Sequence, residues 1–372
     1  APATLGLLAP LSATANEVTI NDFNPAEELA ITNSRVDGLE ARLNNFEAGS
    51  FSETTTASFS VDGYLGYVDD EDANTADDAV SAGYSFQIDL NTTFTGEDSL
   101  DISLDAGNGS TEGIAEFDGN DTAVAGTELV VVDGVSYTFP IGDKVTAIVG
   151  ADTDGSALFT TACVYGGPGN LLDDCANVNA GITGGAITVG ASYDIGGGFA
   201  AAFGAQTENT STFTEESGDQ YALNLAYTAD NYGLSLTYGV VEATQTVNDV
   251  TTLTDEENKF TAINGYYTPE GNLPSISVGY EIGDLGGAAA GADEQASFMV
   301  GLTWDEIGPG SAGVAVGHSN TAENADELYQ YEAYYSYPVN DSMTITPLIY
   351  TLDAAGDVDD TTGMMVKTSF SF

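Results

Sequence analysis

The chain has 372 residues, and its 58 Asp and Glu against 5 Lys and Arg give a formal net charge of −53 at pH 7. This charge excludes a protein that binds nucleic acid through its phosphates, because such binding needs basic residues to displace counterions. It also disfavours attachment to an anionic membrane surface. With 42% hydrophobic and 10% aromatic residues, the chain is nevertheless too apolar to be disordered.

The first 15 residues, APATLGLLAPLSATA, are the one apolar, helix-like run of the chain. They end in Ala13-Thr14-Ala15, a small-x-small pattern that is typical of a signal-peptidase site. We therefore expect residues 1–15 to be the remainder of a cleaved secretory signal peptide, with a short buried helix as the alternative. No stretch reaches the roughly 18 continuous apolar residues that a membrane-spanning helix needs.

Residues 16–50 are expected to form a periplasmic linker that contains a trimerisation helix. Between residues 26 and 47 the apolar positions alternate in steps of three and four, which is the heptad spacing of a coiled coil. An ordinary amphipathic helix is the alternative reading of this pattern. The apolar seam consists of Leu29, Val36, Leu39, Leu43 and Phe46.

Residues 51–372 show runs of about ten residues in which apolar positions alternate with small or polar ones, and no convincing helix. One example is the run from Tyr232 to Val240, where Leu234, Leu236 and Tyr238 face away from Ser235 and its small neighbours. Strands of this length and period suit the wall of a barrel in lipid, because every backbone group must be paired within a closed sheet. The pattern predicts an all-β fold, a transmembrane antiparallel β-barrel of about 16 strands.

The connections between these runs alternate in length, which is the pattern of outer-membrane barrels with their long loops outside the cell. The expected short turns are Thr95–Asp98, Ile141–Gly142, Gly196–Gly197, Asp230–Asn231, Glu270–Leu273 and Asn340–Asp341. The expected long acidic loops are Asp69–Asp78, Gly107–Gly126, Asp152–Thr183, Glu242–Glu257 and Asp353–Asp360.

Aromatic residues within a few positions of the short turns predict a membrane interface at that end of the barrel. The chain closes on Phe370-Ser371-Phe372, an alternating strand with a terminal aromatic residue. Such an ending is the kind that the barrel-assembly machinery recognises. We therefore expect an outer-membrane location, with Phe370 and Phe372 as the insertion signal.

Cys163 and Cys175 lie 12 positions apart in the third long loop, and in an oxidising compartment they are expected to form a disulfide. In trimeric porins the third loop commonly folds inward and narrows the bore. A disulfide would stiffen such a loop. The acids of this loop would then ring a constriction, or alternatively solvate an outer loop: Asp152, Asp154, Asp173 and Asp174.

Inward-facing charge on the strands favours cations over anions, because rings of carboxylates attract cations. The predicted lumen carboxylates are Asp62, Asp89, Asp101, Asp105, Glu281 and Glu332. The basic residues that could oppose them are Lys144 and Lys367, which are assigned to the lumen, and Lys259.

Catalysis finds little support in the sequence. His318 is the only histidine, so a His-based triad or a zinc centre within one chain is not expected. The acidic run Val68-Asp69-Asp70-Glu71-Asp72 lacks the spacing of a calcium-binding EF-hand loop. We expect a protein that is not an enzyme and that has no cofactor and no metal site.

Three stretches resemble cyanobacterial outer-membrane porins of the OprB-type superfamily, whose members are described as carbohydrate-selective or iron-uptake porins. Residues 34–43 (SRVDGLEARL) resemble the linker helix of these proteins, residues 137–146 (YTFPIGDKVT) a hairpin, and residues 331–347 (YEAYYSYPVNDSMTITP) the penultimate hairpin. The resemblance implies a sixteen-stranded trimer that passes inorganic ions and small solutes. Family members usually carry an S-layer-homology (SLH) domain before the linker helix, and only residues 16–30 stand in that place here.

The expected function is therefore that of a homotrimeric porin in outer-membrane lipid, through which ions and small hydrophilic solutes diffuse, with a preference for cations. One alternative is a secreted, acidic, β-rich surface protein or adhesin. Another is a substrate-specific sugar or iron channel. A gated transporter would need a plug domain before the barrel, and a barrel enzyme is disfavoured by the shortage of histidine.

Overall fold

The computed structural model describes residues 54–69, 80–108, 129–169, 171–184, 186–207, 212, 218–247, 250–288, 292–356 and 358–372. The chain divides into two units, Ala1–Glu53 and Thr54–Phe372. The expected signal remnant, linker and trimerisation helix belong to the first unit and lie outside the described residues. In the part of the chain that is described, no helix is long and apolar enough to cross a membrane.

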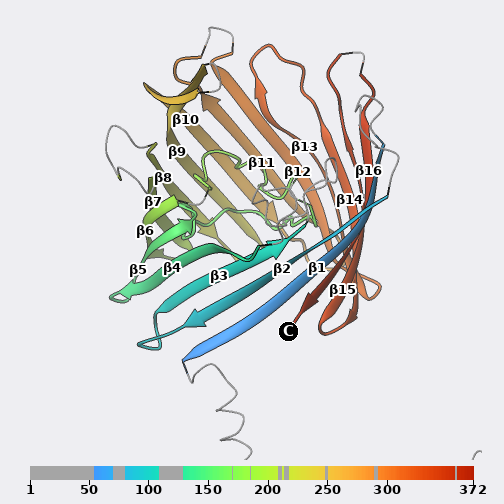
Figure 1. The fold of residues 1–372 in the computed structure, drawn as a ribbon, viewed down its shortest axis with the longest axis horizontal. Helices are drawn as coiled ribbons and strands as arrows, with labels where there is room; N and C mark the ends of the chain where they lie inside the picture. Colours follow the sequence, from blue (N-terminus) through green and yellow to red (C-terminus); the bar gives the residue numbers. More distant parts are fainter. Residues whose placement is uncertain are drawn as a thin grey trace, which may run out of the picture. The chain divides into compact units, whose positions relative to one another are not determined.

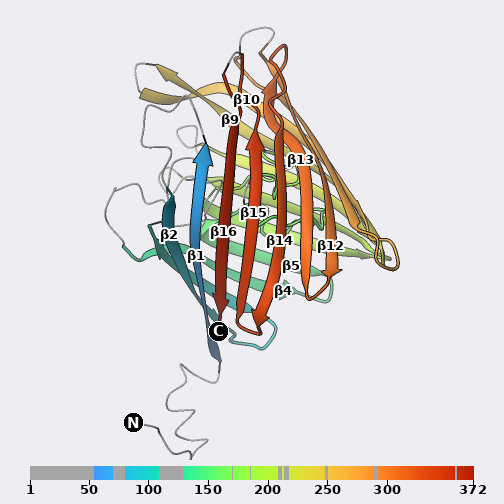
Figure 2. The same ribbon diagram turned by 90° about the vertical axis from the view of Figure 1, so that its right-hand side faces the viewer.

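The second unit is a closed barrel of 16 antiparallel strands, in which each strand pairs with its neighbours in the chain and β1 pairs with β16 (Figures 1 and 2). This confirms the predicted all-β barrel and its strand number. The strands are β1 (Thr55–Asp69), β2 (Ser81–Thr92), β3 (Ser99–Gly107), β4 (Val131–Ile141), β5 (Val145–Thr153), β6 (Ala186–Gly196), β7 (Phe199–Thr207), β8 (Gln220–Thr228), β9 (Tyr232–Val247), β10 (Val250–Tyr267), β11 (Ser275–Asp284), β12 (Glu294–Ile307), β13 (Gly310–Ala322), β14 (Gln330–Asn340), β15 (Met343–Leu352) and β16 (Thr361–Ser371).

Strand β11 shows why the wall has two different faces. Its residues are buried and exposed in strict alternation along the strand. Ser277 and Glu281 point into the barrel interior, the lumen, and are 1% exposed, whereas Val278 and Tyr280 point outward and are more than 40% exposed. Successive side chains of a strand lie on opposite faces, so one sequence period supplies both a polar interior and an apolar exterior.

The barrel closes where the last strand meets the first (Figure 2). The backbone N–H of Phe59 donates to the carbonyl of Phe372 at 2.9 Å, and the N–H of Phe372 donates back to the carbonyl of Phe59 at 3.0 Å. The two phenyl rings stack with their centroids 5.8 Å apart. Closure removes the free strand edges that an open sheet would expose to other chains.

Short connections lie at one end of the barrel, the turn end, and longer ones lie mostly at the other, the loop end. In the turn between β2 and β3, Asp98 accepts hydrogen bonds from the backbone N–H groups of Phe94 and Thr95 and from the hydroxyl of Tyr137. These donors, the tyrosine hydroxyl first, hold the pKa of Asp98 well below its usual range. This short connection therefore has a local basis in turn chemistry.

One predicted loop is wrong. The acidic stretch Glu242–Glu257 was expected to be irregular, but β9 and β10 continue through it and only residues 248–249 separate them. The two strands stay paired, with a register shift between Leu253 and Glu257. The stretch is rich in valine and threonine, whose branched side chains favour strands strongly enough to outweigh the surrounding charge.

Candidate functional site

The connection between β5 and β6, residues 154–184, lies inside the barrel, and we call it the inner loop (Figure 1). The expected disulfide between Cys163 and Cys175 is present within it. Its buried apolar side chains, with Tyr165 and Leu172 among them, pack against the inward-facing Met299 and Ala315 of the barrel wall. Residue 170 is outside the described part of the loop.

The first half of the inner loop is held by small polar side chains of β8, β9 and β11. The N–H of Thr160 donates to Asn224 at 3.1 Å, and Asn224 donates back to the carbonyl of Thr160 at 3.2 Å. The N–H of Ala162 donates to the hydroxyl of Ser235 at 2.9 Å. The hydroxyl of Ser277 accepts hydrogen bonds from the consecutive N–H groups of residues 164 and 165, both at 3.0 Å. The wall thus satisfies loop backbone groups that would otherwise be buried without partners.

Farther along, Tyr165 fastens the loop to β14. Its hydroxyl donates to Oε1 of Glu332 at 2.5 Å, and the hydroxyl of Tyr334 donates to the carbonyl of Gly166 at 2.9 Å. Tyr165 is 5% exposed, and this burial raises its pKa above the ordinary value. The neighbouring Leu171 packs against a cluster from β1, β15 and β16. The inner loop therefore extends from β5 and β6 to the seam at which the barrel closes.

Glu281 of β11 anchors the returning half of the loop. Its carboxylate accepts hydrogen bonds from the backbone N–H of Asn179 at 2.9 Å, from the side-chain amide of Asn179 at 2.7 Å and from the N–H of Ala180 at 2.8 Å. Asn264 of β10 donates to the carbonyl of Cys175 at 2.7 Å. A carboxylate that receives several donors is held firmly, since hydrogen bonds to a charged group are the stronger ones.

Glycines at inward positions leave the space that the loop occupies. A Cβ atom added at Gly279 would overlap the carbonyl of Cys175, and one added at Gly204 would overlap the backbone of Gly155. Neither glycine has a left-handed backbone, so the requirement is one of close approach alone. The sequence of the wall therefore helps to determine the position of the inner loop, together with the sequence of the loop itself.

All four predicted constriction acids have exposed side chains. Asp154 also accepts a hydrogen bond from the N–H of Gly184 at 2.9 Å at the base of the loop. The side chain of Asp174 reaches water, but the protein around it excludes part of that water. This partial burial, together with the charges of Asp173, Glu281 and Asp154, raises the pKa of Asp174 to about 6. These groups therefore lie within electrostatic reach of Asp174, and Asp152, at the end of β5, is not among them.

The predicted lumen acids of the first three strands lie on inward positions. Asp62 forms an ion pair with Lys367 at 3.0 Å. Asp89 accepts hydrogen bonds from Gln87 and Ser103, and Asp101 accepts them from Asn91 and Ser99. Asp105 occupies an inward position opposite Gln87.

Lys144, which the sequence assigns to the lumen, lies in the turn between β4 and β5, where side chains do not follow the alternation of a strand. It lines a cavity together with Thr160 of the inner loop and Asn224 of β8. Its ammonium group lies 5.7 Å from the ring centroid of Tyr193, an outward-facing residue, and donates to the carbonyl of Ile195 at 3.4 Å. Of the two lysines assigned to the lumen, Lys367 alone is paired with a lumen carboxylate in the described structure.

Sequence reasoning missed the side chains that hold the inner loop, chiefly Asn224, Ser235, Asn264, Ser277 and Tyr165. The available signal was the concentration of Asn, Ser and Gly at inward positions of β8 to β13. Within the described ranges, no group of three or more His, Cys, Asp or Glu side chains is arranged to hold a metal ion. What the site can do is narrow an aqueous passage and present carboxylates to it.

The comparisons with solved structures place this chain among porin-like barrels. It is similar to Pseudomonas putida OprB, with a TM-score of 0.61 and 14% identity over 86% of this chain and 94% of that one. It is also similar to a loop-deletion mutant of Vibrio cholerae OmpT, with a TM-score of 0.55 and 13% identity over 86% of this chain and all of the other. A mutant of Rhodopseudomonas blastica porin gives a TM-score of 0.54 and 12% identity, with 86% and 100% covered. At these identities the likeness concerns the fold.

No family model matches the chain. A curated sequence, the uncharacterized protein alr4550 of Nostoc sp. (strain PCC 7120), is 25% identical over 437 aligned positions. The alignment covers 97% of this chain and 74% of that protein.

Proposed function

We propose that this protein is an outer-membrane porin, a water-filled channel through which inorganic ions and small hydrophilic solutes diffuse, with a preference for cations. The observation that carries the proposal is the inner loop, which is fastened inside a closed barrel of 16 strands and leaves Asp154, Asp173 and Asp174 exposed. Barrels of this strand number are wide enough to enclose an aqueous channel. A loop fixed across part of that width sets the size of what passes.

Charge supports the cation preference. Acids line the inner loop and the wall of β1 to β3, whereas Lys367 is already paired with Asp62. The carboxylates of Glu281 and Glu332 accept hydrogen bonds from the inner loop, so these two residues act chiefly as positioning residues. A passage with exposed carboxylates concentrates cations and repels anions.

The outer face supports the membrane location. Leu223, Leu234 and Ile263 each have more than half of their surface exposed, and they belong to an apolar exterior that suits lipid. We propose that a cleaved signal peptide exports the chain and that Phe370 and Phe372 guide insertion by the barrel-assembly machinery. We also propose that the chain assembles into a homotrimer and acts as a channel rather than as an enzyme. We further propose that it is related to the cyanobacterial porins that carry an SLH domain.

The test is reconstitution of the detergent-extracted protein into liposomes that are challenged with uncharged sugars of increasing size. The proposal predicts swelling rates that fall with solute size, together with stepwise conductance in a planar bilayer. Heat-denatured protein in the same lipids is the control. A native protein that stays in solution without detergent, or a folded barrel that passes neither sugar nor ions, would overturn the proposal.

A further inference from the structure

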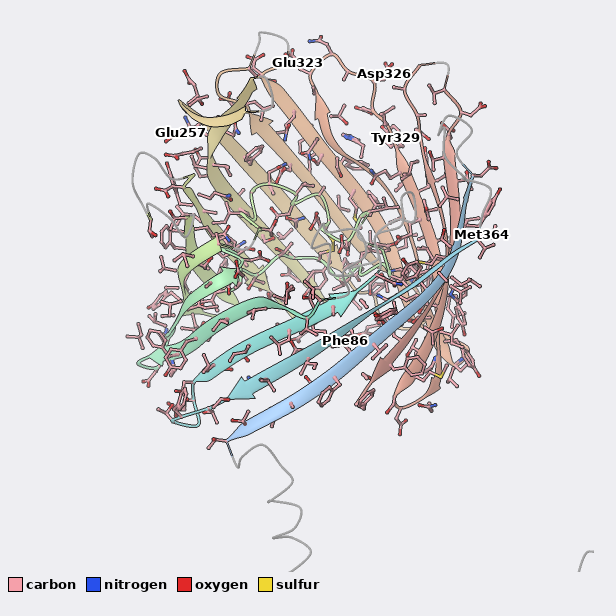
Figure 3. All side chains as sticks on the ribbon, viewed as in Figure 1. Phe86, Glu257, Glu323, Asp326, Tyr329 and Met364 are labelled. Atoms are coloured by element: carbon pink, nitrogen blue, oxygen red, sulfur yellow. A yellow bond between two sulfur atoms is a disulfide. The ribbon has the colours of Figure 1, made fainter. Side chains whose placement is uncertain are left out.

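A cavity of about 550 Å³ lies on the outside of the barrel near the loop end, and we call it the outer pocket. Its floor is made by outward-facing residues of β9, β10, β11 and β12, with Tyr238, Tyr280 and Ile282 among them. Its rim is made by Glu323, Asn324, Ala325 and Glu327 of the connection between β13 and β14. Figure 3 labels Glu323 and Tyr329 in this connection.

The outer pocket is separate from the lumen. Gly279, next to Tyr280, faces the inner loop, so Tyr280 faces the opposite side of the wall. Below the pocket the outward positions of β11 continue with Val278 and Ile276, both apolar and both exposed. The pocket therefore opens onto the apolar outer surface of the barrel and is independent of the conduction proposed above.

His318 lines the outer pocket from an outward position of β13, opposite Phe298. It is 5% exposed, its Nδ1 is hydrogen-bonded with the hydroxyl of Thr321 at 2.9 Å, and its ring lies 5.6 Å from that of Tyr329. An imidazole on the outer face of a barrel costs more than an apolar side chain would unless polar groups surround it. The connection after β13 and the polar pocket provide such surroundings.

The charge of the outer pocket limits what it can bind. Four carboxylates line it, those of Asp284, Glu294, Glu323 and Glu327, against one ammonium, that of Lys259, which is already paired with Glu257 at 3.4 Å. A phosphate or carboxylate headgroup would meet net repulsion there. Carboxylates accept hydrogen bonds from hydroxyl groups, and side-chain amides both donate to and accept from them. The tyrosine rings offer flat apolar faces.

We propose that the outer pocket binds the uncharged sugar headgroup of a membrane glycolipid whose acyl chains run down the apolar strip of β11. Volume, chemistry and position agree with this ligand class. The cavity is within the size range of small-ligand sites, its polar rim matches the hydroxyl groups of a sugar, and its apolar continuation matches hydrocarbon. The glycolipid would be a bound partner of the outer surface and not a transported solute.

The test is native mass spectrometry of the folded, detergent-solubilised protein with two lipids of identical acyl chains. One lipid carries a single galactose and the other carries phosphoglycerol. We expect adducts of the galactolipid in preference to the anionic lipid, and a loss of about tenfold in galactolipid binding for Tyr280→Ala, because a stacked aromatic face is removed. Tyr232→Ala, which removes another outward-facing tyrosine, is the matched control and should bind as the unaltered protein does.

Glu323→Gln is a second variant, in an exposed connection where the barrel wall is left intact, and it should weaken galactolipid binding several-fold through altered polar contacts. Equal binding of both lipids would overturn the proposal. So would an equal loss for Tyr232→Ala, or equal binding of free galactose, which has no acyl chain. Displacement of galactolipid upon association of barrels would assign the pocket to a second copy of the chain instead.

Discussion

Replacing Glu281 by alanine is expected to loosen the returning half of the inner loop without unfolding the barrel. Glu281 lies on β11 and points into the lumen, so its loss leaves the backbone pairing with β10 and β12 untouched. Its carboxylate accepts three hydrogen bonds from Asn179 and Ala180 that have short N···O distances. These contacts fasten the loop near the exposed Asp173 and Asp174.

The size of the effect follows from these contacts. Hydrogen bonds to a charged group contribute about 1.5–3 kcal/mol each, and water entering the lumen would restore part of that. A net weakening of about 3 kcal/mol would raise the ratio of detached to attached loop about a hundredfold. The loop remains held elsewhere by Asn264, Ser277 and the disulfide, so the motion is local.

Single-channel recording in planar bilayers measures the result. Glu281→Ala should show greater open-channel current noise and a higher mean conductance than the unaltered protein, and Glu281→Gln, which keeps one acceptor oxygen, should lie between them. Asp101→Ala is the matched control, because it removes a lumen carboxylate whose hydrogen bonds are to Asn91 and Ser99 of the wall. If Glu281→Ala and Asp101→Ala behave alike, the anchoring argument is refuted.

Three further results are expected. Replacing Cys163 and Cys175 with serine removes a loop closure over 12 positions and should lower the free energy of unfolding by about 3 kcal/mol. Under reducing conditions, which open the disulfide of the unaltered protein, the two proteins should unfold with the same free energy. The folded protein raises the pKa of Asp174 to about 6 from 3.8, so cation selectivity should fall as the pH is lowered through about 6. The free energy of unfolding should rise slightly as the pH falls from about 6 to 3.8, because the folded protein binds the proton more tightly than the unfolded chain, and Asp174→Asn should flatten both pH dependences. Removing Phe372 breaks two backbone hydrogen bonds and one ring contact with Phe59, so the free energy of unfolding of the barrel should fall by about 2–3 kcal/mol. The gel band of the folded protein should then disappear at a lower temperature, and an unchanged temperature would contradict the closure argument.

The barrel could be predicted because its determinants are local. Alternation along a strand, as in Leu234, Ser235 and Leu236, records which side faces lipid and which faces the lumen, and turn residues mark where each strand ends. The error at Glu242–Glu257 arose because acidic composition was weighed more heavily than the valine and threonine content of the same stretch.

The site was less accessible to prediction because its contacts join residues far apart in the chain. Tyr165 meets Glu332, and Asn179 meets Glu281, across separations of 167 and 102 residues. Periodicity can place Glu332 on the lumen side, but it contains no information about which loop atom will reach it. Periodicity is equally uninformative for Lys144, since this residue lies in a turn and a turn residue does not follow the strand period.

The most direct test of the account is the reversal potential of the reconstituted channel under a KCl gradient. The account predicts stepwise currents with a potential of the sign that favours K⁺, and a smaller potential for a variant in which Asp173 and Asp174 are both replaced by asparagine. A potential that favours Cl⁻ would contradict the role given to the exposed carboxylates of the inner loop.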